Sequence, residues 1–249
     1  MHPKRIALVT GANQGIGLQI AKELVANGYT VLVGSRSLEK GETAAAGIGP
    51  EAHALQLDVT APDSVAAAAG RIRSEFGRLD VLVNNAAISH AGAPGRTTQE
   101  VIASNRSSIA SLDEVRTVFE TNVFGVIAVT QALLPLLREA PAARIVNVGS
   151  PLGSLTLNAD PAFPYRAGYG VVYAASKTAL NAVTRAFAIE LEQTNIKVNV
   201  ASPGYTKTAM NNFEGTDTVE QGAQDIVRAA LDVDGPTGTF TGTSGPLPW

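Results

Sequence analysis

The sequence predicts a doubly wound α/β domain, a Rossmann-type parallel sheet with helices on both faces. Short, β-branched and almost continuously apolar runs alternate with longer amphipathic segments, as expected for parallel strands buried on both sides. The first apolar run also ends in a glycine-rich turn that leads into a helix. The expected strands cover residues 6–10, 30–35, 53–57, 80–84, 144–148 and 197–202, with a short last strand over 239–241.

Helix-end signals support the segments between these strands. The helix over 62–76 has Pro62 in its first turn and stops at Gly77, and an apolar stripe marks a helix over 173–193. Two further helices follow capping-box sequences. These boxes are Ser111 with Glu114, before residues 112–134, and Thr218 with Gln221, before residues 219–231. The glycine- and proline-rich end of the chain is expected to be irregular.

The composition favours one globular domain over residues 1–249. Apolar residues make up 45% and charged residues 16%, which argues against disorder, and no linker divides the chain. A net charge of −3 provides no basic excess that would recruit nucleic acid or an anionic membrane surface. We expect neither a signal peptide nor a membrane span, because no apolar run approaches about 18 residues.

The chain has no cysteine, which excludes disulfides and thiolate metal sites and fits a cytoplasmic location. The three histidines lie far apart without metal-ligand spacing, so no metal site is predicted.

Tyr173 and Lys177 stand four residues apart, on one face of a predicted helix. A cation beside a phenol lowers its pKa from about 10, and the tyrosine then exchanges a proton near neutral pH. One charge about 4 Å away, at an effective dielectric near 20, contributes about 4 kcal/mol. That energy corresponds to about three pKa units. The alternative is an amphipathic pair at a helix edge.

The first turn runs from Thr10 to Gly17, with glycines spaced G-x-x-x-G-x-G. Such a turn lets the backbone approach a pyrophosphate, and the following helix start offers free N–H groups. An ordinary glycine-rich turn is the alternative, but the strand–turn–helix context favours a dinucleotide. The residues expected to hold it are Gly11, Asn13, Gln14, Gly15, Ile16 and Gly17.

The second strand ends in Ser35 and Arg36, where no acid is present to bind the ribose 2′-hydroxyl of NAD. An arginine there suits a 2′-phosphate, so we expect NADPH, with Arg36 clamping the phosphate and Ser35 assisting. A solvated surface arginine is the alternative.

Polar residues follow the next two strands. Asp58 and Val59 come after the third strand, where Asp58 either reaches the adenine or caps a turn toward Thr60. Asn85 and Ala86 come after the fourth strand. An asparagine at that point either braces the backbone or lines the cofactor crevice, and the sequence leaves both possibilities open.

Together these elements resemble the short-chain dehydrogenase/reductase family, in its order and over nearly the whole chain. The matching residues are Thr10–Gly17, Asp58, Asn84–Ala87, Asn122, Ser150, Tyr173–Lys177, and Pro203-Gly204 with Thr208. Ala87 departs from the family pattern, which usually has glycine there. The resemblance implies hydride transfer between NADPH and a small-molecule ketone or aldehyde.

The resemblance also implies roles for four catalytic residues. Tyr173 would be the general acid, and Lys177 would lower the tyrosine pKa and hold the nicotinamide ribose. Ser150 would polarise the carbonyl, and Asn122 would anchor a water that relays protons from Lys177 to solvent. Taken singly, Asn122 reads as a locally bonded helix residue and Ser150 as a turn residue.

The same resemblance implies that Pro203, Gly204, Thr206 and Thr208 cradle the nicotinamide end. Residues 151–172 are expected to border the substrate pocket, and residues 205–213 to form a mobile lid. The long stretch 151–172 resembles the carbonyl-reductase branch, and it leaves open whether the protein is a monomer or a homo-oligomer. A nucleotide-binding scaffold without chemistry is the second hypothesis, although such proteins commonly lose the tyrosine or the lysine.

Overall fold

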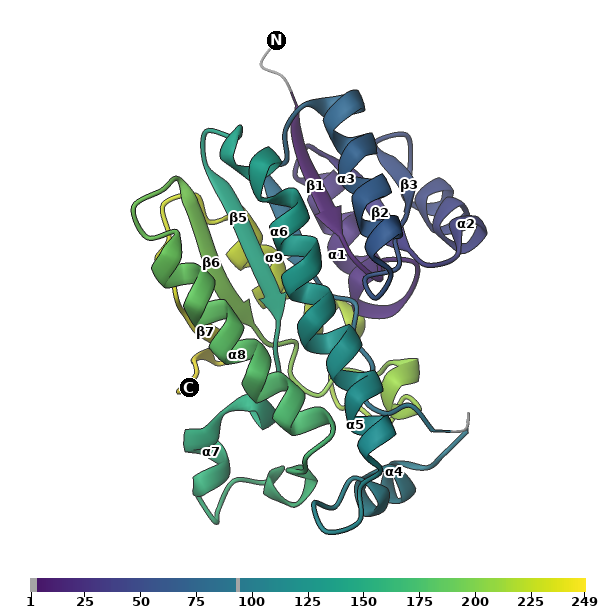
Figure 1. Cartoon of the computed structure of the whole chain (residues 1–249), viewed down its shortest axis with the longest axis vertical. Helices are drawn as coiled ribbons and strands as arrows, with labels where there is room; N and C mark the ends of the chain where they lie inside the picture. The colour runs from purple at the N-terminus through teal and green to yellow at the C-terminus, as the bar shows by residue number, and fades with distance from the viewer. Residues whose placement is uncertain (1–3, 93–94) are drawn as a thin grey trace.

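The computed structural model describes residues 4–92 and 95–249, and it has one central sheet between two layers of helices (Figure 1). The strand order is β3-β2-β1-β4-β5-β6-β7-β8, parallel throughout except that β8 pairs antiparallel with β7. This is the doubly wound order, in which the crossover from β3 to β4 opens a crevice at the strands' carboxyl ends. The strands are β1 (Arg5–Val9), β2 (Tyr29–Ser35), β3 (Ala52–Gln56), β4 (Val81–Asn84), β5 (Ala143–Val148), β6 (Ile196–Ala201), β7 (Phe240–Gly242) and β8 (Gly245–Pro246).

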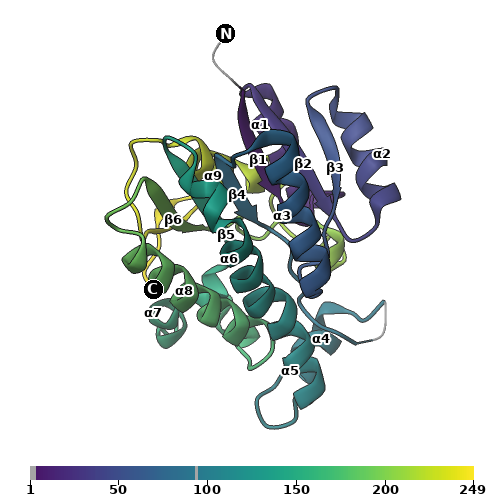
Figure 2. The same cartoon turned by 45° about the horizontal axis from the view of Figure 1, so that its top comes forward.

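Helices α3, α6 and α8 cover one face of the sheet, and α1, α2 and α9 cover the other (Figure 2). The predicted fold class is therefore confirmed. The helices are α1 (Gly15–Ala26), α2 (Leu38–Ile48), α3 (Pro62–Phe76), α4 (Thr98–Ser104), α5 (Leu112–Phe119), α6 (Gly125–Arg138), α7 (Leu155–Ala159), α8 (Tyr173–Glu190) and α9 (Val219–Leu231).

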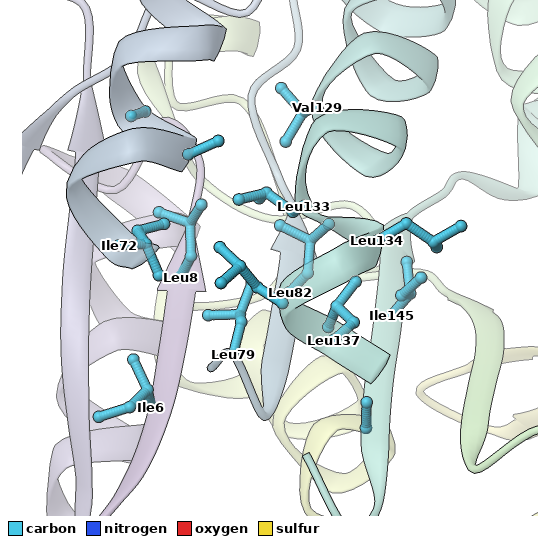
Figure 3. Close-up of a cluster of buried hydrophobic side chains, with 14 of the residues drawn as sticks. Ile6, Leu8, Ile72, Leu79, Leu82, Val129, Leu133, Leu134, Leu137 and Ile145 are labelled. Atoms are coloured by element: carbon cyan, nitrogen blue, oxygen red, sulfur yellow. The ribbon is translucent and has the colours of Figure 1, made fainter. Parts of the chain in front are cut away.

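The two faces of β1 show how the sequence builds both cores. Ile6 and Leu8 point to the α3 and α6 side, whereas Ala7 and Val9 point to the α1 and α9 side. In the first core, Leu82 of β4 lies among side chains of α3 and α6 (Figure 3). Each fully buried leucine or isoleucine of this kind contributes roughly 1.5–3 kcal/mol to folding.

Three predicted helix-end signals are confirmed, and one predicted capping box is wrong. The helix predicted over 173–193 also ends earlier, at Glu190. Pro62 occupies the first turn of α3, Gly77 ends it in the left-handed region, and the Thr218 capping box is formed. Ser111, however, makes no capping hydrogen bond at the start of α5. The Glu114 carboxylate instead accepts hydrogen bonds from Arg96 and from the Ala91 amide.

The long helix predicted over 112–134 runs to Arg138, and a five-residue π-helix over Glu120–Phe124 interrupts it. Among the residues described, Leu112–Arg138 is long and apolar enough to pass for a membrane span by length and composition. We expected no such run, and that expectation was wrong. Leu133 and Leu137 of this stretch lie in the core against the sheet, so packing accounts for its apolar character (Figure 3).

The end of the chain is more ordered than predicted. Gly245–Pro246 forms β8, which we had expected to be irregular. The Trp249 ring lies 5.5 Å from that of Phe240 and 4.6 Å from the Arg185 guanidinium. The short helices α4 and α7 were also missed, although Thr97 and Glu100 form a readable capping box before α4.

Candidate active site

The residues predicted to be catalytic lie beyond the carboxyl ends of β4 and β5. Ser150 follows β5, and Tyr173 opens α8 with Lys177 one turn later. The Lys177 Nζ atom donates to the Val148 carbonyl at 2.8 Å and lies 5.7 Å from the centre of the Tyr173 ring. The Tyr173 hydroxyl is hydrogen-bonded to Ser150. The fold thus brings three of the four predicted catalytic side chains together.

Burial dominates the electrostatics of this pair. It raises the pKa of Tyr173 to about 12, although the hydrogen bond with Ser150 acts in the opposite direction. Burial also lowers the pKa of Lys177 to about 8. The prediction that Lys177 brings the tyrosine pKa near neutrality is therefore wrong for this structure, because desolvation of the buried phenol dominates its pKa. At pH 7 the phenol is neutral and can donate its proton.

Asn122 lies inside the π-helix and is buried. Its Oδ1 accepts from the Ile88 amide at 2.9 Å, and its Nδ2 donates to the Ile88 carbonyl and to the Ser176 hydroxyl. Ser176 in turn donates to the Tyr173 carbonyl at 2.6 Å. Asn122 therefore braces the chain after β4 against the first turn of α8. Its place in a proton relay stays a prediction.

The first turn has the free backbone groups that a pyrophosphate needs. Gly11 and Gly15 adopt φ values of 63° and 57°, which favour glycine. Gln14 starts α1 without a capping side chain, and the first helical turn carries no acid. The N–H groups at this helix start, around Ile16, therefore have no partner within the helix and attract an anion.

Asn85 braces that turn, the first of the two roles left open by the sequence, and its place along the cofactor crevice stays a prediction. Its Nδ2 donates to the carbonyls of Thr10 at 2.8 Å and Gly11 at 3.1 Å. The Thr10 hydroxyl accepts from the amides of Asn85 and Ala86. A Cβ on Gly17 would lie 2.4 Å from Asn85 Nδ2, so only glycine fits there.

At the end of β2, Arg36 is exposed and Ser35 is buried. Ser35 faces Gly41 of α2 and packs against that helix, and its predicted assistance in phosphate binding stays a prediction. Ser37 lies beside Arg36 and caps α2 by accepting from the Lys40 amide. We did not predict this cap, although a serine directly before a helix is a common N-cap residue.

Asp58 caps a turn, the second of its two predicted possibilities. Its Oδ1 accepts from the Thr60 amide at 2.9 Å and from the Thr60 hydroxyl at 2.7 Å. Burial opposes ionisation, but these hydrogen bonds and the Arg36 charge outweigh it and lower the Asp58 pKa. Val59 is buried against Gly125 of α6, so its side chain packs between elements.

The chain after β6 returns toward the first turn. Gly204 has a φ of 72°, and Thr206 is buried with its hydroxyl donating to the Pro203 carbonyl. Thr206 therefore stabilises this turn, and its predicted contact with the cofactor stays a prediction. Thr208 comes closest to the crevice, because its methyl group lies 3.7 Å from the position of a Cβ on Gly15. A group held by the first turn would lie beside Thr208.

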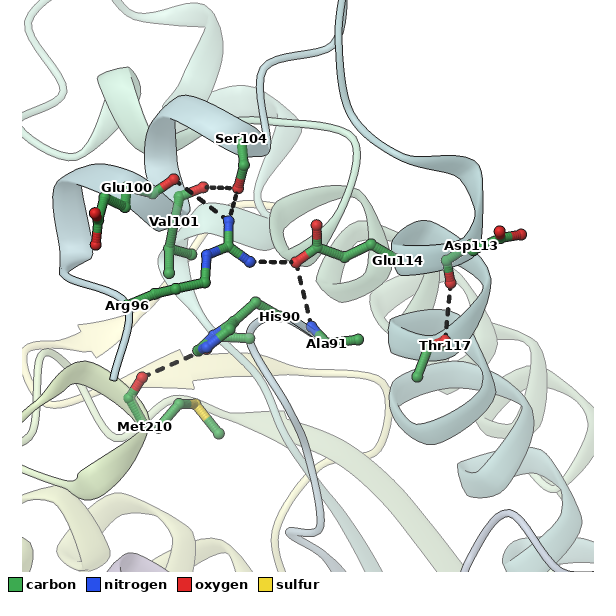
Figure 4. A network of polar contacts seen from close by, with 11 residues as sticks. His90, Ala91, Arg96, Glu100, Val101, Ser104, Asp113, Glu114, Thr117 and Met210 are labelled. Atoms are coloured by element: carbon green, nitrogen blue, oxygen red, sulfur yellow. Dashed lines mark hydrogen bonds and ion pairs between the residues drawn. The ribbon is translucent and has the colours of Figure 1, made fainter. Parts of the chain in front are cut away.

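Three long connections leave β4, β5 and β6 and meet beyond the catalytic residues. Arg96, on the connection after β4, forms an ion pair with Glu114 at 3.0 Å (Figure 4). Asn212 of the predicted lid donates to the Arg96 carbonyl at 2.9 Å. On the other side, the ring of Tyr165 lies 6.0 Å from that of Tyr205. The segment 205–213 thus contacts both neighbouring connections.

The comparisons with known proteins agree with this geometry. The family model described as short chain dehydrogenase matches residues 5–218. The short-chain dehydrogenase anuI of Penicillium roqueforti is 37% identical over 238 residues, covering 92% of this chain and 89% of that protein. Salutaridine reductase of Papaver somniferum is 31% identical over 293 residues, covering 95% of this chain and 94% of that protein.

The solved structures that are similar over nearly the whole chain include the NADPH-bound carbonyl reductase from chicken fatty liver, with a TM-score of 0.81, 26% sequence identity and 99% of both chains covered. Fold, matched residues and relatives agree, and the chain therefore belongs to the short-chain dehydrogenase/reductase family of oxidoreductases.

Proposed function

We propose that this protein reduces ketones or aldehydes with NADPH and catalyses the reverse alcohol oxidation. The observation that carries the proposal is the neutral phenol of Tyr173, hydrogen-bonded to Ser150, with the Lys177 ammonium on the next helical turn. A proton donor and a polar hydroxyl thus lie together at the edge of the sheet where a dinucleotide would lie.

In this proposal Ser150 hydrogen-bonds the substrate carbonyl oxygen and stabilises the alkoxide charge that develops on it. Tyr173 transfers its phenolic proton to that oxygen. Lys177 places a positive charge near the resulting phenolate and favours proton loss. When bound, NADPH supplies the hydride that the carbonyl carbon receives.

The residues that would hold NADPH lie along the carboxyl ends of β1, β2 and β6. The uncapped start of α1 suits the pyrophosphate, and Arg36 suits the 2′-phosphate, since its side chain is exposed directly after β2. Thr208 lies across the crevice from Gly15, near the nicotinamide end. The NADPH-bound carbonyl reductase among the similar structures supports this choice of cofactor.

The relatives and the two segments expected to border the substrate support this choice of substrate class. Similar proteins include salutaridine reductase and (+)-neomenthol dehydrogenase, whose names indicate carbonyl or alcohol groups on small molecules. Tyr165, Met210 and Phe213 are exposed on segments 151–172 and 205–213, which suits an apolar ketone. Cytoplasmic location stays a prediction from composition.

The test is NADPH consumption with a panel of aliphatic, cyclic and aromatic carbonyl compounds. Tyr173→Phe should reduce kcat by at least about a hundredfold, because general acid catalysis contributes 10²–10⁴-fold, and NADPH binding should be unchanged. Tyr169→Phe is the matched control, since Tyr169 is exposed and its hydroxyl lies 3.5 Å from that of Thr178. Full activity of Tyr173→Phe would exclude the catalytic role. NADPH binding without turnover of any carbonyl would favour the scaffold hypothesis.

A further inference from the structure

The four residues that follow Ser150 have an unusual set of hydrogen bonds. Two buried asparagine amides hold the backbone carbonyls of all four, residues 151–154. The two N–H groups of Asn158 Nδ2 are shared among three carbonyls, those of Ser154 at 2.7 Å, Leu152 at 3.2 Å and Pro151 at 3.3 Å. The Pro151 and Ser154 carbonyls also accept from the backbone amides of Ser154 and Asn158. Asn181 Nδ2 donates to Gly153 at 3.1 Å. No carbonyl of this turn depends on solvent.

Burial of these two asparagine side chains is energetically unfavourable in one respect. Asn158 is 8% exposed and Asn181 5% exposed, and in each case the Oδ1 atom is buried without a hydrogen-bond partner. A buried unpaired acceptor is unfavourable, and a leucine of similar size would remove it. Asparagine at these positions therefore fits a requirement for its NH2 group, which is directed at the turn.

The turn lies directly on the catalytic helix. A Cβ on Gly153 would lie 2.8 Å from the carbonyl carbon of Lys177, so the two backbones touch. Asn181 is one turn after Lys177 on α8, and its bond to Gly153 joins the turn to the helix that carries Tyr173. The turn also reaches the catalytic serine, because the Leu152 amide donates to Ser150 Oγ at 3.2 Å.

We infer that Asn158 is a positioning residue for Ser150: together with Asn181 it fixes the turn 151–154, and the turn holds the serine hydroxyl against Tyr173. The inference rests on the proposed function, because Ser150 matters only if a carbonyl is reduced there. Asn158 lies on α7, in the long segment before Tyr173, and its own carbonyl accepts from Arg166 Nε at 3.0 Å. The pocket segment thus contributes to catalytic geometry as well as to the wall.

The test uses Asn158→Leu in the full chain, with Asn199→Leu as the matched control. Asn199 is also 8% exposed, and it bonds Pro236 and Thr239 beside β7, so its loss affects stability without touching the turn. The first measurement is amide hydrogen exchange at residues 152–154. Asn158→Leu should accelerate exchange there at least about tenfold, and Asn199→Leu should not. Unchanged exchange in Asn158→Leu would refute the inference, whether or not the protein reduces carbonyls.

The second measurement is a double-mutant cycle with Ser150→Ala. Asn158→Leu should lower kcat at least about tenfold in the wild-type background and less than about twofold in the Ser150→Ala background, because the serine is already absent. The pH at which alcohol oxidation reaches half of its maximal rate should also rise. The Ser150 hydrogen bond favours the Tyr173 phenolate, so its loss raises the Tyr173 pKa. Equal losses in both backgrounds would show that Asn158 acts independently of Ser150.

If Asn158→Leu does not fold, Asn158→Ser retains one donor and should show smaller changes of the same kind. Absence of turnover by the wild-type protein would refute the proposed function instead.

Discussion

Lys177 donates a hydrogen bond to the backbone carbonyl of Val148, 2.8 Å away, in the last residue of β5. This bond ties the first turn of α8 to the strand that leads into Ser150, and it holds the ammonium in a buried position. Burial lowers the pKa of Lys177 to about 8, so charging this lysine in the folded protein costs free energy.

We predict that this cost appears in the pH dependence of stability. The folded pKa is lower than the value of 10.5 for an unperturbed lysine, so the unfolded chain binds more protons between pH 8 and 10.5. The free energy of unfolding should therefore rise with pH across that window, by up to about 3 kcal/mol. Tyr173 acts oppositely, because its raised pKa of about 12 makes stability fall above pH 10.

Urea unfolding from about pH 7 to pH 10 measures this slope. Lys177→Met should remove the rise, and Lys22→Met, which changes an exposed residue of α1, should retain it. A slope that persists in Lys177→Met would mean that another group titrates in the window.

A second prediction concerns cofactor choice. Arg36→Ala should raise the Kd for NADPH about 10- to 100-fold, since hydrogen bonds to charged groups contribute about 1.5–3 kcal/mol. The Kd for NADH should change less than about twofold. Arg138→Ala, at the exposed end of α6, is the control. Fluorescence titration with both cofactors measures the effect, and equal weakening would show that Arg36 does not bind the 2′-phosphate.

What the sequence could predict depended on how local each feature is. The spacing of Tyr173 and Lys177 needs only helix geometry, and it placed both side chains correctly. Ser35 ends β2 and Arg36 follows it, and only the fold shows which of the two α2 covers. The strand order also confirmed the doubly wound sheet that the alternation of short apolar runs with amphipathic segments predicted.

Features that depend on distant partners were out of reach. Glu114 satisfies a capping-box sequence, yet Arg96 competes for its carboxylate across the connection after β4. The pKa of Tyr173 was predicted from one neighbouring charge, whereas burial by the whole active site dominates it. Asn158 carried no recognisable motif, because its partners become neighbours only when the segment 151–172 folds.

Gly17→Ala should damage the cofactor site through packing alone. The added Cβ would lie 2.4 Å from Asn85 Nδ2 and 2.6 Å from the Gly11 carbonyl, so the first turn must shift. Overpacking of this kind costs about 1–3 kcal/mol, and we expect NADPH binding to weaken at least about tenfold. Gly70→Ala, in α3, is the control, because nothing lies within 4 Å of its Cβ and alanine favours a helix by about 0.5–1 kcal/mol. The temperature of thermal unfolding should therefore fall for Gly17→Ala and rise slightly for Gly70→Ala, whereas NADPH titration should show weaker binding for Gly17→Ala alone.

Glu114→Gln should loosen the wall formed after β4. The Arg96–Glu114 pair is mostly buried, with side chains 18% and 13% exposed, and the carboxylate also accepts from the Ala91 amide (Figure 4). Removing the charge leaves the Arg96 guanidinium without its anion, so Arg96 is held less firmly. Asn212 of the segment 205–213 donates to the Arg96 carbonyl, and this segment therefore becomes more mobile. We expect KM for the carbonyl substrate to rise about 3- to 10-fold with little change in kcat or in NADPH affinity.

Asp113→Asn tests whether that effect is specific to the buried pair. The neighbouring Arg116–Asp113 pair has side chains 69% and 91% exposed, and a surface pair of this kind contributes about 0–1 kcal/mol. Asp113→Asn should therefore leave KM unchanged. Added salt should also distinguish the two ion pairs, because screening weakens an exposed pair much more than a buried one. If both variants raise KM equally, the net charge of α5 matters and the bond between Arg96 and Glu114 does not.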